Sequence, residues 1–154
     1  MTFHTTAPTL RALLLAAPLL VLAACSDSPT DPDDHDAEPV TAEVYERGTE
    51  NLLADVHDDH WDGSVTLALG EEIAIDVRFF NADGDEIELG GEYTVEAEIA
   101  QGQPTDVIHF DAHGDHIDIE GESVGETSLI LHFWHGGHAD WSTPALPVVV
   151  EAVE

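Results

Sequence analysis

Short runs of alternating apolar and polar residues begin at about Val44 and continue to the end of the sequence. They are enriched in Val, Ile, Thr and aromatic residues, and Gly, Asp, Asn or Pro residues separate them, which is typical of β-strands joined by turns. Helical spacing of apolar residues is not evident. Seven strands are predicted, namely SVTLALG, EIAIDVRFF, EYTVEAEIA, DVIHFDA, HIDIEG, TSLILHFW and LPVVVEAV. In size and spacing they fit a Greek-key β-sandwich.

The turns between these strands resemble those of a known family. The matching features are Gly70 after the first strand, the NADG turn at 81–84, Gly125 before the sixth strand and the Val-rich last strand. Over about residues 64–152 the chain is similar to bacterial Ig-like domains of the group-2 type. The resemblance implies an all-β, Ig-like Greek-key sandwich of about seven strands over residues 44–154. These framework features specify a fold and say little about function.

Residues 1–24 are predicted to be an export signal. Arg11 precedes the apolar stretch ALLLAAPLLVLAA, which is too short for a permanent membrane span and has the length of a signal-peptide core. The residues LAAC at 22–25 resemble the bacterial lipoprotein signal. The resemblance implies that Cys25 is lipidated and anchors the protein to the cell envelope, at the outer membrane in a diderm host because Ser26 follows. An ordinary secretory signal with a chance cysteine is the alternative.

Residues 25–43 are predicted to form a flexible acidic tether, because they are rich in Asp, Pro and Ser and carry few large apolar side chains. His35 lies in this segment and is expected to be solvated. Cys25 is the only cysteine. The sequence therefore offers no disulfide framework, and no thiolate for a metal.

The chain is strongly acidic, with 33 Asp and Glu residues against three Arg and no Lys, and a formal net charge of −30. Such a charge repels phosphate backbones and attracts cations, so nucleic acid is excluded as a partner. Dense acids with no Lys are also typical of proteins from salt-rich habitats, where counterions screen the repulsion. Salt adaptation gives no reason for ten histidines.

Histidines gather at the connections between predicted strands, in DVHDDHWDG, DAHGDHID and LHFWHGGHADW. Consecutive antiparallel strands alternate in direction, so two connections separated by two strands lie at the same end of the sandwich. We therefore expect the two later hairpins to lie on opposite sheets, about 10 Å apart, and to meet at one ion. The candidate ligands are His113, His116, His135, His138, His132, His57, His60 and Asp140.

Several of these residues have alternative interpretations. His57 and His60 lie at the same end only if Gly90 and Gly91 do not form an extra hairpin that reverses the strand directions. His132 alternates with core-facing residues and is either a ligand or a sheet-surface residue, while His109 is interpreted as a solvated strand residue. Asp140 either accepts a hydrogen bond from a histidine or caps the turn.

Neutral imidazole and carboxylate ligands suit Zn²⁺, Cu²⁺ or Ni²⁺, and Cu⁺ is disfavoured without thiolate or several Met ligands. Zn²⁺ is the first choice, because a His-dominated tetrahedral site needs only three or four ligands. Protons compete for the same nitrogens, so the affinity is expected to fall below about pH 6.5.

The NADGD turn partly matches the ligand spacing of a calcium-binding loop. Asn81, Asp83, Asp85 and Glu92 fall at the first, third, fifth and twelfth places of an EF-hand loop, but Glu86 stands where that loop requires Gly, and strands flank it. We predict a hairpin turn there, which leaves weak Ca²⁺ or Mg²⁺ binding open.

The sequence predicts an envelope-anchored lipoprotein that captures, buffers or delivers Zn²⁺ or another borderline divalent ion. Its partners would be the membrane, through the lipid anchor, and a metal transporter or receptor. The alternative is a structural or adhesive Ig-like surface module without a specific metal role. Enzymatic activity is not expected, because no nucleophile elbow, phosphate loop or cysteine nucleophile is evident.

Overall fold

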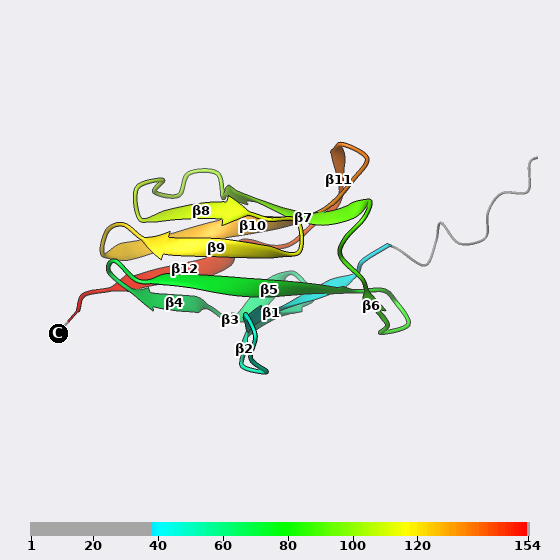
Figure 1. Ribbon diagram of the computed structural model, residues 1–154, viewed down its shortest axis with the longest axis horizontal. Coiled ribbons are helices and arrows are strands. Elements are labelled where there is room, and N and C mark those ends of the chain that lie inside the picture. Colours follow the sequence, from blue (N-terminus) through cyan, green and yellow to red (C-terminus); the bar gives the residue numbers. More distant parts are fainter. Residues whose placement is uncertain (1–37, 154) are drawn as a thin grey trace, which may run out of the picture. The chain divides into compact units, whose positions relative to one another are not determined.

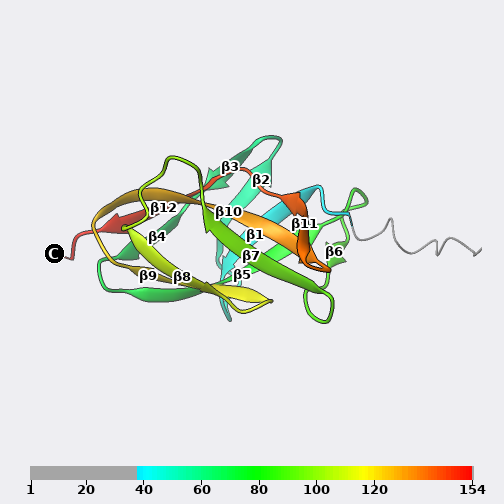
Figure 2. The same ribbon diagram turned by 90° about the horizontal axis from the view of Figure 1, so that it is seen from above.

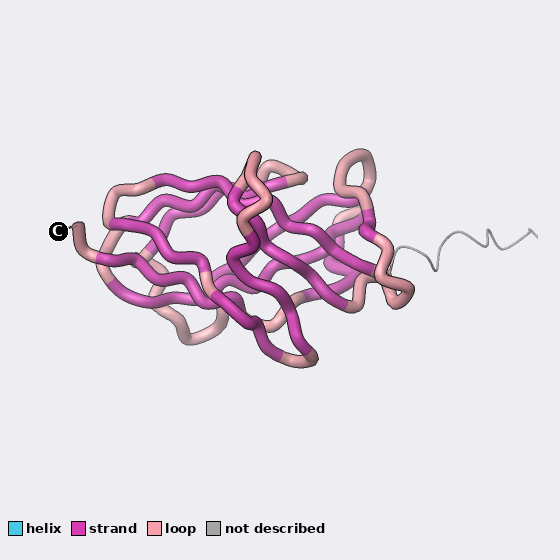
Figure 3. The backbone as a smooth tube through the Cα atoms, turned by 90° about the horizontal axis from the view of Figure 1, so that it is seen from below, coloured by secondary structure: helices cyan, strands magenta, loops and turns pink. Residues whose placement is uncertain are grey.

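A computed structural model describes residues 38–153. The predicted signal, the predicted lipidation at Cys25 and His35 lie outside the described residues. The described part contains strands and loops only (Figures 1 and 3), and no helix in it is long and apolar enough to cross a membrane. The strands are β1 (Thr41–Glu46), β2 (Leu52–His57), β3 (His60–Gly63), β4 (Val65–Ala68), β5 (Glu72–Phe80), β6 (Glu86–Ile87), β7 (Tyr93–Ile99), β8 (Ile108–Ala112), β9 (His116–Gly121), β10 (Gly125–His135), β11 (His138–Ser142) and β12 (Leu146–Glu151).

The strands form two sheets, so the predicted all-β sandwich is confirmed. Sheet A has the order β3-β2-β1-β5-β9-β8, and β6 also pairs with β5. Sheet B has the order β11-β10-β12-β4, and β7 lies on the other edge of β10 (Figure 2). Neighbouring strands are antiparallel except β4 and β12, which are parallel.

All seven predicted strands are present, and the structure adds β1, β2, β3, β6 and β11. The strand count is therefore higher than the predicted seven. β1 begins at Thr41, inside the range predicted as tether. The NADGD segment forms the predicted hairpin turn, in which the Asn81 side-chain oxygen accepts hydrogen bonds from the backbone N–H groups of Asp83 and Asp85 at 3.0 and 2.9 Å.

The alternation of apolar and polar residues buries one face of each sheet. The Phe133 ring of sheet B lies edge-on to Phe79 of sheet A, with centroids 5.3 Å apart, and stacks on Tyr93 at 5.0 Å. Trp61 of β3 donates a hydrogen bond from its ring nitrogen to the carbonyl of Pro144 at 2.8 Å, which ties the edge of sheet A to sheet B. Removal of this apolar surface from water is the main stabilising contribution to the fold.

Carboxylates oppose each other across neighbouring strands of sheet A. Like charges in directly opposite positions are destabilising, so these positions favour the uptake of cations. The directly opposed pairs are Asp55 with Asp62, Asp111 with Asp118, and Glu72 with Glu120.

Gly63 allows the chain to pass from β3 in sheet A to β4 in sheet B. Its φ is +103°, and a Cβ atom at this position would overlap the backbone carbonyl of Leu53. We expect Gly63→Ala to lower the free energy of unfolding, measured by urea denaturation. Gly48→Ala is the matched control, because Gly48 also has a positive φ but has open space around the added methyl. The overlap should make the Gly63 variant less stable than the control by about 1–3 kcal/mol, and equal losses would contradict this.

Candidate metal centre

The β8–β9 hairpin is a tight reversal that also contacts the opposite sheet. The backbone N–H of His113 donates to the carbonyl of His116 at 2.9 Å, and Gly114 adopts the positive φ of +88° that the turn requires. The carbonyl of Gly114 accepts a hydrogen bond from Val95 of β7 at 2.8 Å. The turn is therefore held at a fixed place against sheet B.

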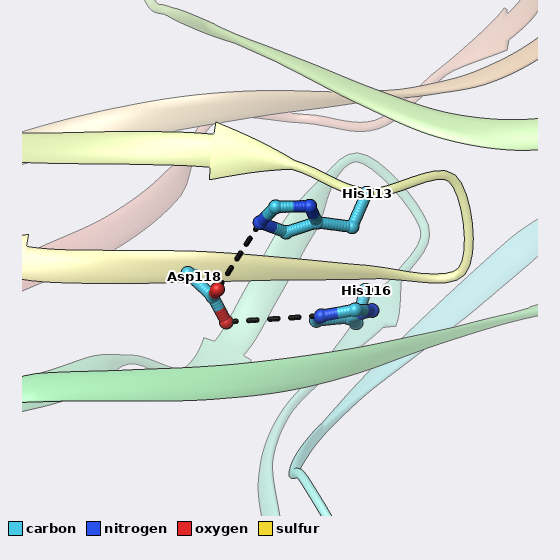
Figure 4. A group of neighbouring side chains, drawn as sticks. All are labelled: His113, His116 and Asp118. Atoms are coloured by element: carbon cyan, nitrogen blue, oxygen red, sulfur yellow. Dashed lines mark ion pairs between the residues drawn. The ribbon is translucent and has the colours of Figure 1, made fainter.

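Three metal-ligating side chains converge on this hairpin (Figure 4). Nε2 of His113 lies 3.1 Å from one carboxylate oxygen of Asp118, and Nε2 of His116 lies 3.8 Å from the other. The two imidazole rings are stacked, with centroids 4.8 Å apart. One ligand atom from each of the three residues lies within 4.8 Å of the other two.

The burial of β9 explains why His116 and Asp118 share a face. Ile117 and Ile119 are fully buried in the core, so the residues that alternate with them point outward. The side chain of His116 is 20% exposed, and that of Asp118 is 36% exposed. The centre is thus partly sheltered and still open to solvent.

A second carboxylate orients His116. Nδ1 of His116 donates to Asp115 at 2.6 Å, and Asp115 in turn accepts a hydrogen bond from Arg47 at 3.2 Å. Arg47 is also hydrogen bonded to Asp76, which lies directly opposite His116 on β5. A neutral imidazole that donates from Nδ1 carries its lone pair on Nε2, which is the nitrogen of His116 that faces Asp118.

The same contacts set the ionisation of Asp115. The hydrogen bond from His116 and, to a lesser extent, that from Arg47 hold the pKa of Asp115 below its ordinary value. A lowered pKa in the folded state stabilises the fold above the ordinary pKa, and this contribution is lost as the pH falls through the lowered value. The carboxylate is therefore ionised at neutral pH, as a partner of a metal-bound imidazole must be.

The donor set fits a borderline divalent cation. Zn²⁺ binds imidazole nitrogen and carboxylate oxygen at about 2.0–2.2 Å, so ligand atoms less than 5 Å apart reach one ion after small side-chain rotations. Three protein ligands leave one tetrahedral position for water or another molecule. Sequence reasoning identified His113 and His116 but missed Asp118, which it had assigned to a strand without a role.

The β10–β11 and β2–β3 hairpins place five further predicted ligands in separate groups. Asp140 contacts His135 at 3.3 Å and His138 at 2.6 Å. His57 and His60 flank the β2–β3 turn and lie directly opposite each other. Neither hairpin joins the β8–β9 group.

His132 and His109 lie on strands away from these turns. His132 hydrogen bonds to Ser142 at 2.7 Å and lies 3.6 Å from Glu98, and it is not part of a hairpin group. His109 lies 3.2 Å from Asp111 on β8, as a solvent-exposed strand residue.

The expected meeting of two hairpins at one ion is not found. They do belong to opposite sheets and share an end of the sandwich, but β10 extends beyond β9. Val95 bonds to Gly114 and pairs with Phe133, whereas His135 lies two residues farther out. Within residues 38–153, no group of close ligand atoms combines histidines from both hairpins.

Comparisons with known proteins do not identify the centre. No family model matches the chain, and no curated protein matches it. The crystal structure of domains 4 and 5 of the S-layer protein SbsC is similar, with 16% sequence identity and a TM-score of 0.42. The match covers 73% of this chain and 65% of that chain. A similarity at this level carries no conclusion about function.

The contacts of Asp115 predict how its carboxyl group titrates. We expect His116→Ala to raise the pKa of Asp115 more than Arg47→Ala does, because the hydrogen bond from His116 is the larger cause of the lowered pKa. The measurement is a carbon-13 NMR titration of the Asp115 carboxyl group. Arg78→Ala is the control, since Arg78 lies over the Tyr45 ring and should leave Asp115 unchanged. A larger shift in the Arg47 variant would contradict the expectation.

Proposed function

We propose that this chain is an exported, lipid-anchored protein that binds Zn²⁺, or a related borderline divalent ion, through His113, His116 and Asp118. The observation that supports the proposal most directly is the convergence of two imidazole nitrogens and one carboxylate on a single hairpin. Opposed carboxylates on the same sheet raise the local concentration of cations. The residue types then select among those cations, because imidazole favours Zn²⁺, Cu²⁺ and Ni²⁺ over Ca²⁺ and Mg²⁺.

The exposure of the centre favours exchange of the ion over permanent structural use. Structural zinc sites are closed by four protein ligands, whereas three ligands leave an open position. The side chain of His113 is 46% exposed, so a ligand from a second protein has access to that position. Capture, buffering or delivery of the ion is therefore the role that the proposal assigns.

The cellular setting in the proposal comes from the sequence. The lipoprotein-like residues LAAC at 22–25 and the acidic stretch after them support an anchored domain on a tether. A metal transporter or receptor in the envelope is the partner that this arrangement suits. The β-sandwich serves here as a rigid support for the hairpin.

Isothermal titration with Zn²⁺ tests the proposal on the purified protein. We expect saturable binding tighter than about 10 µM, which is a binding free energy of roughly −7 kcal/mol. The double variant His113→Ala/His116→Ala should lose the tightest binding component. The loss should exceed the roughly 10–100-fold effect typical of removing only an outer hydrogen-bond partner. Binding should also weaken below about pH 6.5, where protons occupy imidazole nitrogens.

The matched control is His109→Ala, which removes an exposed histidine beside an aspartate on the same sheet. It should bind Zn²⁺ as the parent does. Circular dichroism should show both variants folded, because the substituted side chains are not in the core. No saturable binding, or the same affinity and stoichiometry in the double variant, would refute the proposal.

A further inference from the structure

Three hairpins of the domain carry the same six-residue pattern, H-x-x-H-x-D. In each copy the two histidines flank a two-residue turn, and the aspartate follows the second histidine by two positions. These copies contain six of the eight histidines in the described residues, and only His109 and His132 fall outside them. The copies are HDDHWD at 57–62 (β2–β3), HGDHID at 113–118 (β8–β9) and HGGHAD at 135–140 (β10–β11).

Hairpin geometry explains why this spacing brings the three side chains together. Residues that flank a two-residue turn are direct cross-strand neighbours and point to one face of the sheet. In the register, His57 lies opposite His60, and His135 lies opposite His138. In β3 and β9 the aspartate, two residues farther along the strand, points to the same face because side chains alternate. In β11 a β-bulge interrupts the pairing at Asp140, and its side chain still lies beside both histidines of that hairpin.

The turns themselves have a common conformation at their first residue. A positive φ at this position gives a mirror-image turn, which matches the twist of paired strands. The φ values are 53° for Asp58, 88° for Gly114 and 58° for Gly136.

In all three hairpins one aspartate lies against both histidines, with a separate oxygen toward each. Asp62 lies 3.9 Å from His57 and 3.5 Å from His60. Asp140 lies 3.3 Å from His135 and 2.6 Å from His138. Asp118 makes the same kind of contacts at the candidate metal centre, but among the described residues only that centre already has one ligand atom from each residue within 4.8 Å of the other two. At the other two hairpins the side chains would have to rotate further to surround an ion.

We infer that the β2–β3 and β10–β11 hairpins are two further binding sites for the same class of ion, so that the domain binds three ions. The inference rests on the proposed function of the β8–β9 centre and extends it to hairpins with the same donors. Each further hairpin also has an additional carboxylate. Asp55 lies 2.8 Å from His57, and Glu92 lies 3.4 Å from His135.

The three sites are separated and should bind independently. In sheet A, β1 and β5 lie between β2 and β9, which places those two strands about 14 Å apart at the usual strand spacing. The β10–β11 hairpin belongs to the other sheet. Groups this far apart without shared ligands contribute additively.

Exposure sets the expected order of affinity. At the β2–β3 hairpin the side chains of His57, His60 and Asp62 are 60–64% exposed, so ordering them around an ion costs the most conformational entropy. At the β10–β11 hairpin His138 is 67% exposed, but His135 and Asp140 are each 32% exposed, and the His135 ring lies 4.8 Å from the Tyr93 ring. The β8–β9 site should bind most tightly, followed by β10–β11 and then β2–β3.

The test counts Zn²⁺ equivalents in the full protein, with excess MgCl₂ present to occupy isolated carboxylates. Calorimetry gives the stoichiometry, and long-range nitrogen-15 NMR spectra of the histidine rings show which imidazoles bind. The parent should bind three equivalents, and each of three double variants should bind two while the remaining two pairs of histidines still respond. The double variants are His57→Ala/His60→Ala, His113→Ala/His116→Ala and His135→Ala/His138→Ala.

The control is His109→Ala/His132→Ala, which removes the two histidines outside the pattern and should leave three equivalents. If the parent binds one ion and the variant lacking His113 and His116 binds none, the inference is overturned and the proposed function stands. If the parent binds no Zn²⁺, the proposed function itself fails. Dispersed NMR spectra of every variant would show that lost binding does not come from unfolding.

Discussion

The direct pairing of residues across a tight β-turn is the constraint on which the candidate centre depends. Backbone hydrogen bonds fix the distance between the two strands, so the side chains that flank the turn cannot move apart. Burial of the alternate residues in the core determines to which face of the sheet these side chains point. Burial of Ile117 and Ile119 turns His116 and Asp118 to the outer face, and the bond between Val95 and Gly114 anchors the turn to the opposite sheet. The ligand arrangement is therefore a consequence of the sandwich itself.

In the strands that sequence analysis predicted, the spacing of the apolar residues and the residue composition both indicate a β-strand. The sequence TSLILHFW has apolar residues at alternate core-facing positions and is rich in β-branched and aromatic residues, and it forms most of β10. Three of the strands it missed, β3, β6 and β11, lack one of these signals. β11 has the sequence HADWS, and its exposed residues, next to two glycines, resemble a loop. β3 has only four residues, and β6 has two and pairs only with β5. Such strands depend on tertiary pairing, which local propensity does not encode.

For the site, the residue types and the position at one end of the sandwich could be predicted. Which of these residues share one binding group could not. His113 and His116 were recognised because they flank a turn, but Asp118 follows inside a strand and was not distinguished from the many surface acids. The repeated H-x-x-H-x-D spacing would have found it. The expectation of one shared ion was wrong. Counting strand directions shows at which end of the sandwich a turn lies, but it does not show how far each strand extends. The additional length of β10 carries His135 beyond Gly114.

The opposed carboxylates of sheet A also bear on how neighbouring copies of the domain behave. Exposed edge strands offer unpaired backbone groups on which another chain can add a strand, and this is a common route to aggregation. The edges of sheet A are β3 and β8, which carry Asp62 and Asp111. A second copy that approached either edge would bring its own acids against these residues, within a chain of net charge −30. The electrostatic repulsion therefore disfavours edge-to-edge pairing of two copies through β3 or β8.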